Sequence, residues 1–150
     1  MPSRLAKSLL FATPADCEQA FYEALANADA ETVAELWLDD EEVCCIHPGS
    51  PRLLGHAAVL ASFAAVLESG PIRINATLKR AVEAAGLALH NVIEEVLVTE
   101  GHAQRVVHVI TTHAFLKTPA GWKMILHHAS LAPEGGATEL ESASSHGTLH

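Results

Sequence analysis

The sequence has no long apolar run, and it carries few positive charges. No apolar stretch approaches the roughly 20 residues that a helix needs to cross a bilayer, so a membrane span is not expected. Lys and Arg together number 9 against 18 Asp plus Glu, which gives a formal net charge of −9. Nucleic acids and anionic lipids are bound by cationic surfaces, so neither is predicted as a partner.

Cysteine is scarce and poorly spaced for disulfides. An odd count with two adjacent members, Cys17, Cys44 and Cys45, favours free thiols in a reducing compartment. No Cys-x-x-Cys spacing is present, so a structural zinc site is not expected. The short apolar stretch within residues 4–11 is below the roughly 7 residues of a signal peptide. A cytoplasmic location is therefore predicted.

What is present suits one domain. The 150 residues are 49% hydrophobic and 18% charged, as in a single soluble globular unit. We expect an N-terminal extension over residues 1–13, a folded domain over 14–132 and a tail over 133–150. The tail is rich in Gly, Ser, Ala and Glu without periodicity, which predicts disorder.

Helix signals fill the first half of the chain. Thr13 can cap a helix that has Pro14 in its first position, and Asp29 can cap a second, shorter one. Residues 43–46 form a short apolar run typical of a strand, stopped by His47-Pro48-Gly49. Gly55 opens a third helical pattern, which ends at Gly70-Pro71.

The second half reads as strands. Residues 72–82, 87–99, 103–117 and 122–132 are β-rich segments separated by short turn sequences. These segments exceed the usual strand length of about 5–6 residues, so long and strongly bent strands are expected. Helices followed by a strand meander predict an α+β fold, in which helices pack on one face of a curved antiparallel sheet.

Three motifs occur in one order: Cys45-Ile46-His47-Pro48-Gly49, then Leu54-Gly55 opening a helix, then a closing strand Gly121-Trp122-Lys123-Met124-Ile125-Leu126-His127-His128-Ala129-Ser130 that follows Thr111-Thr112-His113-Ala114-Phe115. In this order the chain resembles the SnoaL-like branch of the nuclear transport factor 2-like superfamily over residues 15–133. It is also similar to the association domain of calcium/calmodulin-dependent kinases.

The resemblance implies a cone-shaped fold. A bent sheet would wrap around a pocket, helices would close its narrow side, and two copies would pair sheet to sheet. Relatives include isomerases, dehydratases, cyclases, binding proteins and oligomerisation modules, so the fold does not select one chemistry.

Alternation along the strands separates side chains by face. By analogy with the similar kinase association domain, the faces that hold Glu94, His113 and His127 are assigned to the cavity. A carboxylate beside an imidazole raises the pKa of the ring and favours acid–base catalysis. The alternative is a hydrogen-bonded polar patch or a dimer contact without catalysis. In the last strand, strict alternation places His127 on one face of the sheet and Trp122 and Met124 on the other.

The remaining candidates are ligand-binding wall residues: Trp37, Cys45, His47, Phe63, Val92, Thr111 and Phe115. For His47 the alternatives are a ligand contact at the rim or a turn residue, and only one of Cys44 and Cys45 can face the cavity. The aromatic residues suit either a substrate cage or a packed core. No metal and no cofactor is predicted, because nothing in the spacing demands one.

Two functions remain open. The first is a small-molecule-binding domain, as a binding protein or as an enzyme of proton-transfer, hydration or isomerisation type acting on a modest apolar ligand. The second is a non-catalytic dimerisation or association module. The Val-rich strands after Ala103 suit a sheet face buried against a second copy, so a homodimer is predicted.

Overall fold

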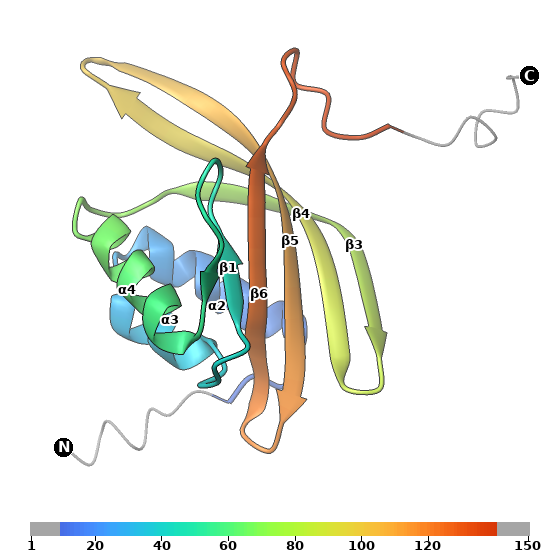
Figure 1. Cartoon of the computed structure of the whole chain (residues 1–150). Helices are drawn as coiled ribbons and strands as arrows, with labels where there is room; N and C mark the ends of the chain where they lie inside the picture. Colours follow the sequence, from blue (N-terminus) through green and yellow to red (C-terminus); the bar gives the residue numbers. More distant parts are fainter. Residues whose placement is uncertain (1–9, 141–150) are drawn as a thin grey trace, which may run out of the picture.

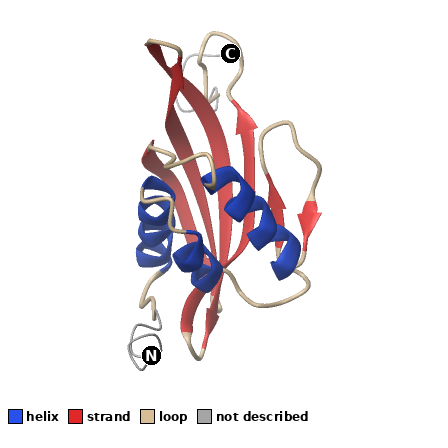
Figure 2. Cartoon of the chain, turned by 90° about the vertical axis from the view of Figure 1, so that its left-hand side faces the viewer, coloured by secondary structure: helices blue, strands red, loops and turns tan. Residues whose placement is uncertain are grey.

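The computed structural model describes residues 10–140 and has three helices on one face of a six-stranded curved sheet (Figures 1 and 2). The helices are α2 (Pro14–Ala26), α3 (Ala30–Leu36) and α4 (His56–Leu67). The strands are β1 (Cys44–Ile46), β2 (Leu53–Leu54), β3 (Ile74–Ala84), β4 (Leu87–Glu100), β5 (Ala103–Thr118) and β6 (Gly121–Leu131). Their order in the sheet is β2-β1-β6-β5-β4-β3. The α+β fold class is confirmed.

Each helix begins where a local signal predicts it. The Thr13 side chain accepts a hydrogen bond from the Asp16 N–H at 3.0 Å, and Asp29 accepts one from the Thr32 N–H at 3.0 Å. These caps satisfy backbone donors that the first turn leaves free. Gly55 precedes α4 with a φ of +92°, a backbone conformation that glycine adopts without steric cost.

Strands β3 to β6 form the expected antiparallel meander, joined by two-residue turns. The end of β4 and the start of β5 form a hairpin arm that reaches past the helices (Figure 1). Two features were not predicted. A two-residue strand, β2, completes one edge, and β1 pairs in parallel with β6, so that Cys45 lies opposite His127. The sheet is therefore not antiparallel throughout.

A bulge in β6 overturns the predicted faces of that strand. Ala114 pairs with Leu126 and Phe115 pairs with Met124, which leaves Ile125 without a partner. One extra residue shifts the alternation by one position. Trp122 and Met124 are therefore 3% and 0% exposed on the same face as His127, rather than on the opposite face.

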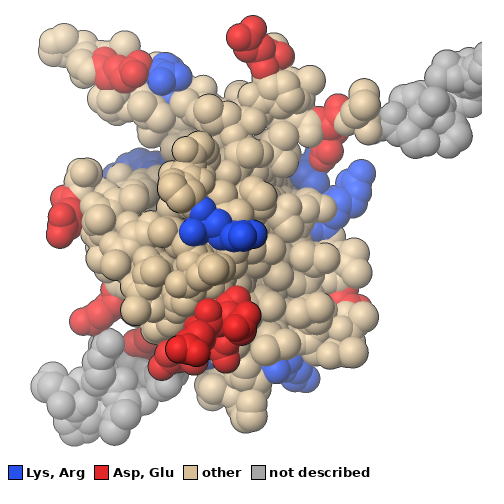
Figure 3. Space-filling model, in the orientation of Figure 1, with Lys and Arg blue, Asp and Glu red and all other residues tan. Residues whose placement is uncertain are grey.

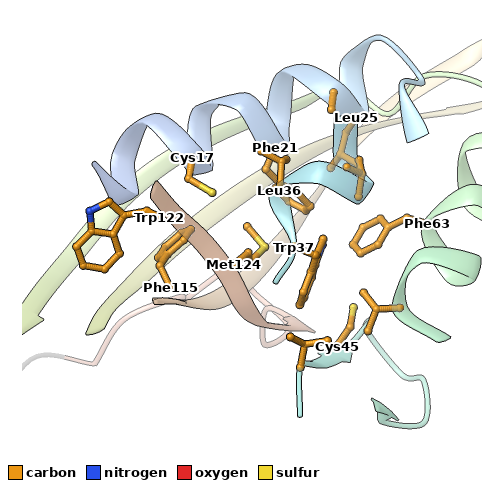
Figure 4. Packing of buried hydrophobic residues seen from close by; sticks show 14 of the residues in the cluster. Cys17, Phe21, Leu25, Leu36, Trp37, Cys45, Phe63, Phe115, Trp122 and Met124 are labelled. Carbon is orange, nitrogen blue, oxygen red and sulfur yellow. The ribbon is translucent and has the colours of Figure 1, made fainter. Parts of the chain in front are cut away.

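The core fills the space between the helices and one end of the sheet. Figure 4 shows Trp37 between Met124 and Phe63, with Phe21 of α2 directed toward Leu36. Trp37 and Phe21 are among the largest fully buried side chains. Burying an apolar side chain of this size contributes about 1.5–3 kcal/mol to stability, so these aromatic residues fix where the helices sit on the sheet.

The chain before α2 also docks on the domain. The Phe11 carbonyl accepts a hydrogen bond from the Trp122 N–H at 3.0 Å, so the folded unit starts earlier than residue 14. Residues 133–140 contain neither helix nor strand. The rest of the predicted tail and of the predicted extension lies outside the described residues. None of the helices described is long and apolar enough to cross a membrane.

Candidate functional site

A cavity of about 260 Å³ lies between α2, α4 and the concave face of the sheet. Three of its lining residues are polar: His47, Glu94 and His127. The rest of the wall is apolar and is formed by Phe21, Leu25, Pro48, Phe63, Val66, Ile72, Ile74, Val96, Val98, Val107, Val109, Ala129 and Leu131. The cavity is thus an apolar chamber with a few polar groups, as is typical of small-molecule sites.

Three histidines form one row across the sheet, which starts at His127 on the cavity wall and leads away from the cavity. His90 pairs with His113 between β4 and β5, and His113 pairs with His127 between β5 and β6. All three side chains are buried on the concave face. His113 Nε2 lies 2.8 Å from His127 Nδ1, so the ring on the cavity wall is hydrogen-bonded to the ring behind it.

Two histidines of the row, His90 and His113, share one carboxylate, that of Glu18 on α2. Glu18 Oε2 lies 2.7 Å from His113 Nδ1, and its Oε1 lies 3.0 Å from His90 Nδ1. Burial alone would raise the pKa of Glu18, but the hydrogen bonds and charges of the two rings outweigh it and hold the pKa below its usual value. Glu18 is therefore an ionised acceptor between two imidazoles.

An ionised Glu18 fixes the donor at one end of the row. A carboxylate only accepts, so His113 donates from Nδ1. The bond between His113 Nε2 and His127 Nδ1 depends on the charge of His113: a neutral His113 accepts there and leaves Nε2 of His127 unprotonated, whereas a charged His113 donates there. Burial, together with His113 and His47, holds the pKa of His127 well below its usual value. His127 is thus a neutral imidazole on the cavity wall.

A second buried pair lies beside this row. The hydroxyl of Tyr22, on α2, is 2.6 Å from Glu94 Oε2. Burial raises the pKa of Tyr22, so the phenol keeps its proton. The Tyr22 O–H therefore donates a hydrogen bond to the carboxyl group of Glu94. Burial also raises the pKa of Glu94, although the bond from Tyr22 acts against this. Glu94 therefore retains its own proton to a higher pH than an exposed glutamate does.

His47 lies at the end of β1, where its ring meets side chains rather than local backbone. Its Nε2 is 2.7 Å from Ser62 Oγ and 3.6 Å from Cys45 Sγ. The ring centroids of His47 and His127 are 5.9 Å apart. Burial lowers the pKa of His47, so this ring adds a second neutral imidazole to the wall.

The structure brings some of the predicted residues to the cavity and leaves others in the interior. Glu94, His127, His47 and Phe63 line the wall, and His113 reaches it only through His127. The other predicted wall residues do not line this cavity. Trp37, Cys45, Thr111 and Phe115 are buried in the packed interior, and Val92 lines a groove between α2 and β3.

Three polar residues of the site were not predicted: Glu18, Tyr22 and His90. The sequence places His90 on the same face as Glu94, which is a signal for that residue. Glu18 and Tyr22 are one turn apart on α2, at the edge of its apolar face beside Cys17 and Phe21. A buried glutamate at such an edge is distinctive only once its burial is known.

The polar groups are not arranged around a common point. Among residues 10–140, no group of three or more His, Cys, Asp or Glu side chains has the geometry of a metal site. His90 and His113 both direct Nδ1 at Glu18, so their nitrogens meet a carboxylate.

On the face drawn in Figure 3, Lys and Arg side chains of the described residues lie in small separate groups and form no continuous basic surface.

Comparison with known proteins places the fold. The SnoaL-like domain family matches residues 15–134. A candidate calcium/calmodulin-dependent protein kinase type II association domain from Thiobacillus denitrificans is 29% identical, with a TM-score of 0.76 over 83% of this chain and 99% of its own. A candidate dehydratase of the NTF2-like family from Streptomyces avermitilis is 31% identical, with a TM-score of 0.72 over 78% of this chain and 92% of its own.

A ketosteroid isomerase-like protein from Erwinia carotovora atroseptica has a TM-score of 0.66, covering 78% of this chain and 92% of its own. At 18% identity it shows the shared fold alone. The comparison with curated proteins gave no match.

Proposed function

The chain belongs to the SnoaL-like domain family, and we propose that it binds a small, uncharged, largely apolar molecule in the cavity and moves a proton on it. Isomerisation and dehydration both need such a step. The observation that carries the proposal is the hydrogen-bonded row from Glu18 through His113 to His127, because with a neutral His113 it leaves a proton-accepting nitrogen on an apolar wall.

The proposed step balances within the site. His127 Nε2 takes a proton from a carbon next to a carbonyl group of the ligand, while its Nδ1 proton passes to Nε2 of His113. The positive charge then rests on His113, beside the Glu18 carboxylate at 2.7 Å. Return of a proton from His127 to a different carbon, with the Nε2 proton of His113 passing back to His127 Nδ1, completes an isomerisation. The negative charge that develops on the ligand oxygen needs a hydrogen-bond donor. Glu94, whose pKa is raised by burial and which Tyr22 holds in place, is the donor on this wall in its protonated form.

The wall limits the class of ligand. Among residues 10–140, no Lys or Arg lines the cavity, and burial lowers the pKa of both His47 and His127. An anionic ligand would therefore find no fixed positive charge. At about 260 Å³ the cavity is near the small end of ligand pockets, which favours a compact ring or short chain. A dehydratase activity is compatible with the description of the Streptomyces relative.

Deuterium exchange into small cyclic ketones tests the proposal. Cyclohexanone and 2-cyclohexenone are incubated with the protein in D2O, and the loss of α-proton signal is followed by NMR. We expect protein-dependent exchange that falls roughly tenfold or more in His127→Gln. The matched control is His128→Gln, because His128 is the exposed neighbour on the other face of β6. Equal rates in His127→Gln and the unmodified protein would refute the assignment of His127 as the base.

We also propose that two copies pair through the outer face of the sheet. Leu89, Leu97 and Val106 lie on that face and are each at least 40% exposed, and exposed apolar side chains on a sheet face favour burial against a partner. If ketone exchange fails and pairing holds, an association module is the better description. Light scattering on dilution, with Leu89→Lys as the disrupting variant, tests the pairing. A stable monomer at micromolar concentration would contradict it.

A cytoplasmic location is proposed as well. The cysteines of the described residues, Cys17, Cys44 and Cys45, are all free thiols. Free thiols persist in reducing compartments. Fractionation of cells that make the protein, followed by immunodetection, tests the location, and recovery outside the cytoplasmic fraction would contradict it.

A further inference from the structure

A groove of about 460 Å³ runs between α2 and β3 and shares one wall residue, Ile74, with the cavity. The α2 residues on its wall recur at helical spacing: Ala15, Glu18, Gln19, Tyr22, Glu23 and Ala26. Side chains from β3 and Val92 of β4 form the opposite wall. The groove therefore lies along one face of α2, and the cavity lies on the other side of the buried polar residues.

Two hydrogen-bonded routes connect the cavity with this groove. One runs from His127 through His113 to Glu18, and the other runs from Glu94 to Tyr22. His127 and Glu94 line the cavity, whereas Glu18 and Tyr22 line the groove. Each polar group that faces the cavity from β4 or β6 is thus bonded toward a residue that faces the groove. The side chain of Glu18 is 9% exposed, while His113 between the two spaces is 0% exposed.

We infer that the groove between α2 and β3 is a proton port, through which the cavity exchanges protons with solvent while a ligand occupies its mouth. This inference rests on the proposed function for its biological use. The hydrogen-bonded path from His127 to the groove is present without a substrate, so proton exchange along it can be measured in the free protein.

The apolar wall explains why such a path is needed. A bound ligand fills the mouth, where the neighbouring side chains include Val66 and Leu131. These residues offer no hydrogen-bonding groups to carry a proton outward. His47 is on the same wall, with its ring centroid 5.9 Å from that of His127, but its nitrogen contacts Ser62 and Cys45 instead of His127. A proton left on His127 would then have to return to the ligand or move inward. The row provides the inward direction, because each ring nitrogen is already hydrogen-bonded to the next acceptor.

The transfers balance as follows. A proton arrives at His127 Nε2, the Nδ1 proton passes to His113 Nε2, and the His113 Nδ1 proton passes to Glu18 Oε2. Glu18 then releases a proton to water in the groove. When His127 gives its Nε2 proton back to the ligand, Glu18 takes up a proton from water and the sequence runs in reverse. Over the whole cycle the ligand regains the proton that it gave, one proton of the row is replaced by a proton from water, and every side chain is restored.

Ring-proton exchange in the free protein tests the port without any substrate. The protein is labelled with 15N-histidine, and the exchange of the His113 and His127 ring N–H protons with water is measured by NMR. Gln19→Trp narrows the groove beside Glu18, and Leu131→Trp narrows the cavity mouth. Both positions are exposed, so both variants are expected to fold. Gln19→Ala is the control for loss of the glutamine itself.

We expect Gln19→Trp to slow exchange roughly fivefold, with Leu131→Trp and Gln19→Ala within about twofold of the unmodified protein. Glu18→Gln removes the final acceptor and is expected to slow exchange further. Slowing by Leu131→Trp without slowing by Gln19→Trp would overturn the port, as would ring protons that do not exchange at all. If ketones show no exchange but the ring protons behave as expected, the port stands and the proposed reaction fails.

Discussion

His113 Nε2 and His127 Nδ1 lie 2.8 Å apart, and this hydrogen bond joins the cavity wall to a carboxylate on a helix. The two residues are direct partners in the register of β5 and β6, so backbone pairing sets the spacing of the rings. Glu18 completes the arrangement from α2 at 2.7 Å from His113. The position of α2 on the sheet thereby places a carboxylate at the inner end of the bond between the two rings.

Folding stability is expected to fall as the pH drops below the ordinary histidine value. Burial holds the pKa of His127 well below 6.5, so the unfolded chain takes up a proton before the folded chain does. The stabilising contribution is complete above about pH 6.5 and is lost as the pH falls toward the folded pKa, with a slope of up to about 1.4 kcal/mol per pH unit. His47 acts in the same direction, whereas the raised pKa of Glu94 acts in the opposite one.

Urea unfolding between about pH 5 and pH 8 measures this dependence. His127→Gln should show a shallower decline than the unmodified protein, and His128→Gln should keep the original decline. A decline of the same slope in all three proteins would assign the pH dependence to other groups.

Replacing Glu18 is expected to destabilise the fold strongly. In Glu18→Gln, one of the two ring N–H groups of His90 and His113 faces an amide NH2 instead of an acceptor. Leaving a buried donor without a partner costs about 2–4 kcal/mol in this setting. Glu23→Gln is the matched control on the exposed side of the same helix, with an expected change within about 0.5 kcal/mol. Equal losses in the two variants, measured by urea unfolding, would show that the buried bonds do not stabilise the protein.

Removing the phenol hydroxyl should raise the pKa of Glu94. The Tyr22 O–H donates to Glu94 at 2.6 Å and so favours the ionised carboxylate. Tyr22→Phe removes this bond without removing the ring, so the carboxyl group keeps its proton to a higher pH. Titration of 13C-labelled glutamate by NMR follows the change. Glu95, an exposed residue next to it in the chain, is the internal control. A Glu94 pKa that is unchanged or lower would contradict the assigned direction of the hydrogen bond.

Gly121 should tolerate no larger residue. Its φ is +92°, and a Cβ there would lie 2.8 Å from the Phe11 backbone nitrogen. Gly101 has a φ of +61° with nothing within 4 Å of such a Cβ. Gly101→Ala therefore measures the conformational cost alone, about 1 kcal/mol. Gly121→Ala adds displacement of Phe11 and should cost about 2–4 kcal/mol in urea unfolding. Similar costs at the two positions would mean that Phe11 is not held against β6.

The fold was largely predictable because its signals are local. The caps at Thr13 and Asp29 and the glycine before α4 act within one turn of the chain, and each marks an observed helix start. The long β-rich segments correspond to β3 to β6, because alternation and turn residues are read from neighbours in sequence. β2 was missed because its two residues carry no such signal.

The candidate site was only partly predictable. Alternation places Glu94, His113 and His127 on faces of their strands, and the structure buries all three on the concave face. Glu94 lies close enough to His113 for the charge of the ring to act on its pKa. Its hydrogen bond nevertheless goes to Tyr22, and the carboxylate that bonds His90 and His113 is Glu18. The bulge at Ile125 also escaped prediction, because an unpaired residue is defined by its partner strand and not by its own sequence.

The sequence by itself determined the helix starts and the long strands, since these depend on dihedral preferences and a period of two, whereas the cavity face of each strand was assigned by analogy with the kinase association domain. Only the tertiary structure decided which carboxylate serves the histidines. Glu18 and His113 are 95 residues apart in the chain, and they meet because packing of Phe21 and Trp37 fixes α2 on the sheet. Contacts between elements follow from the whole core, so the base assigned to the cavity wall depends on packing that no local pattern encodes.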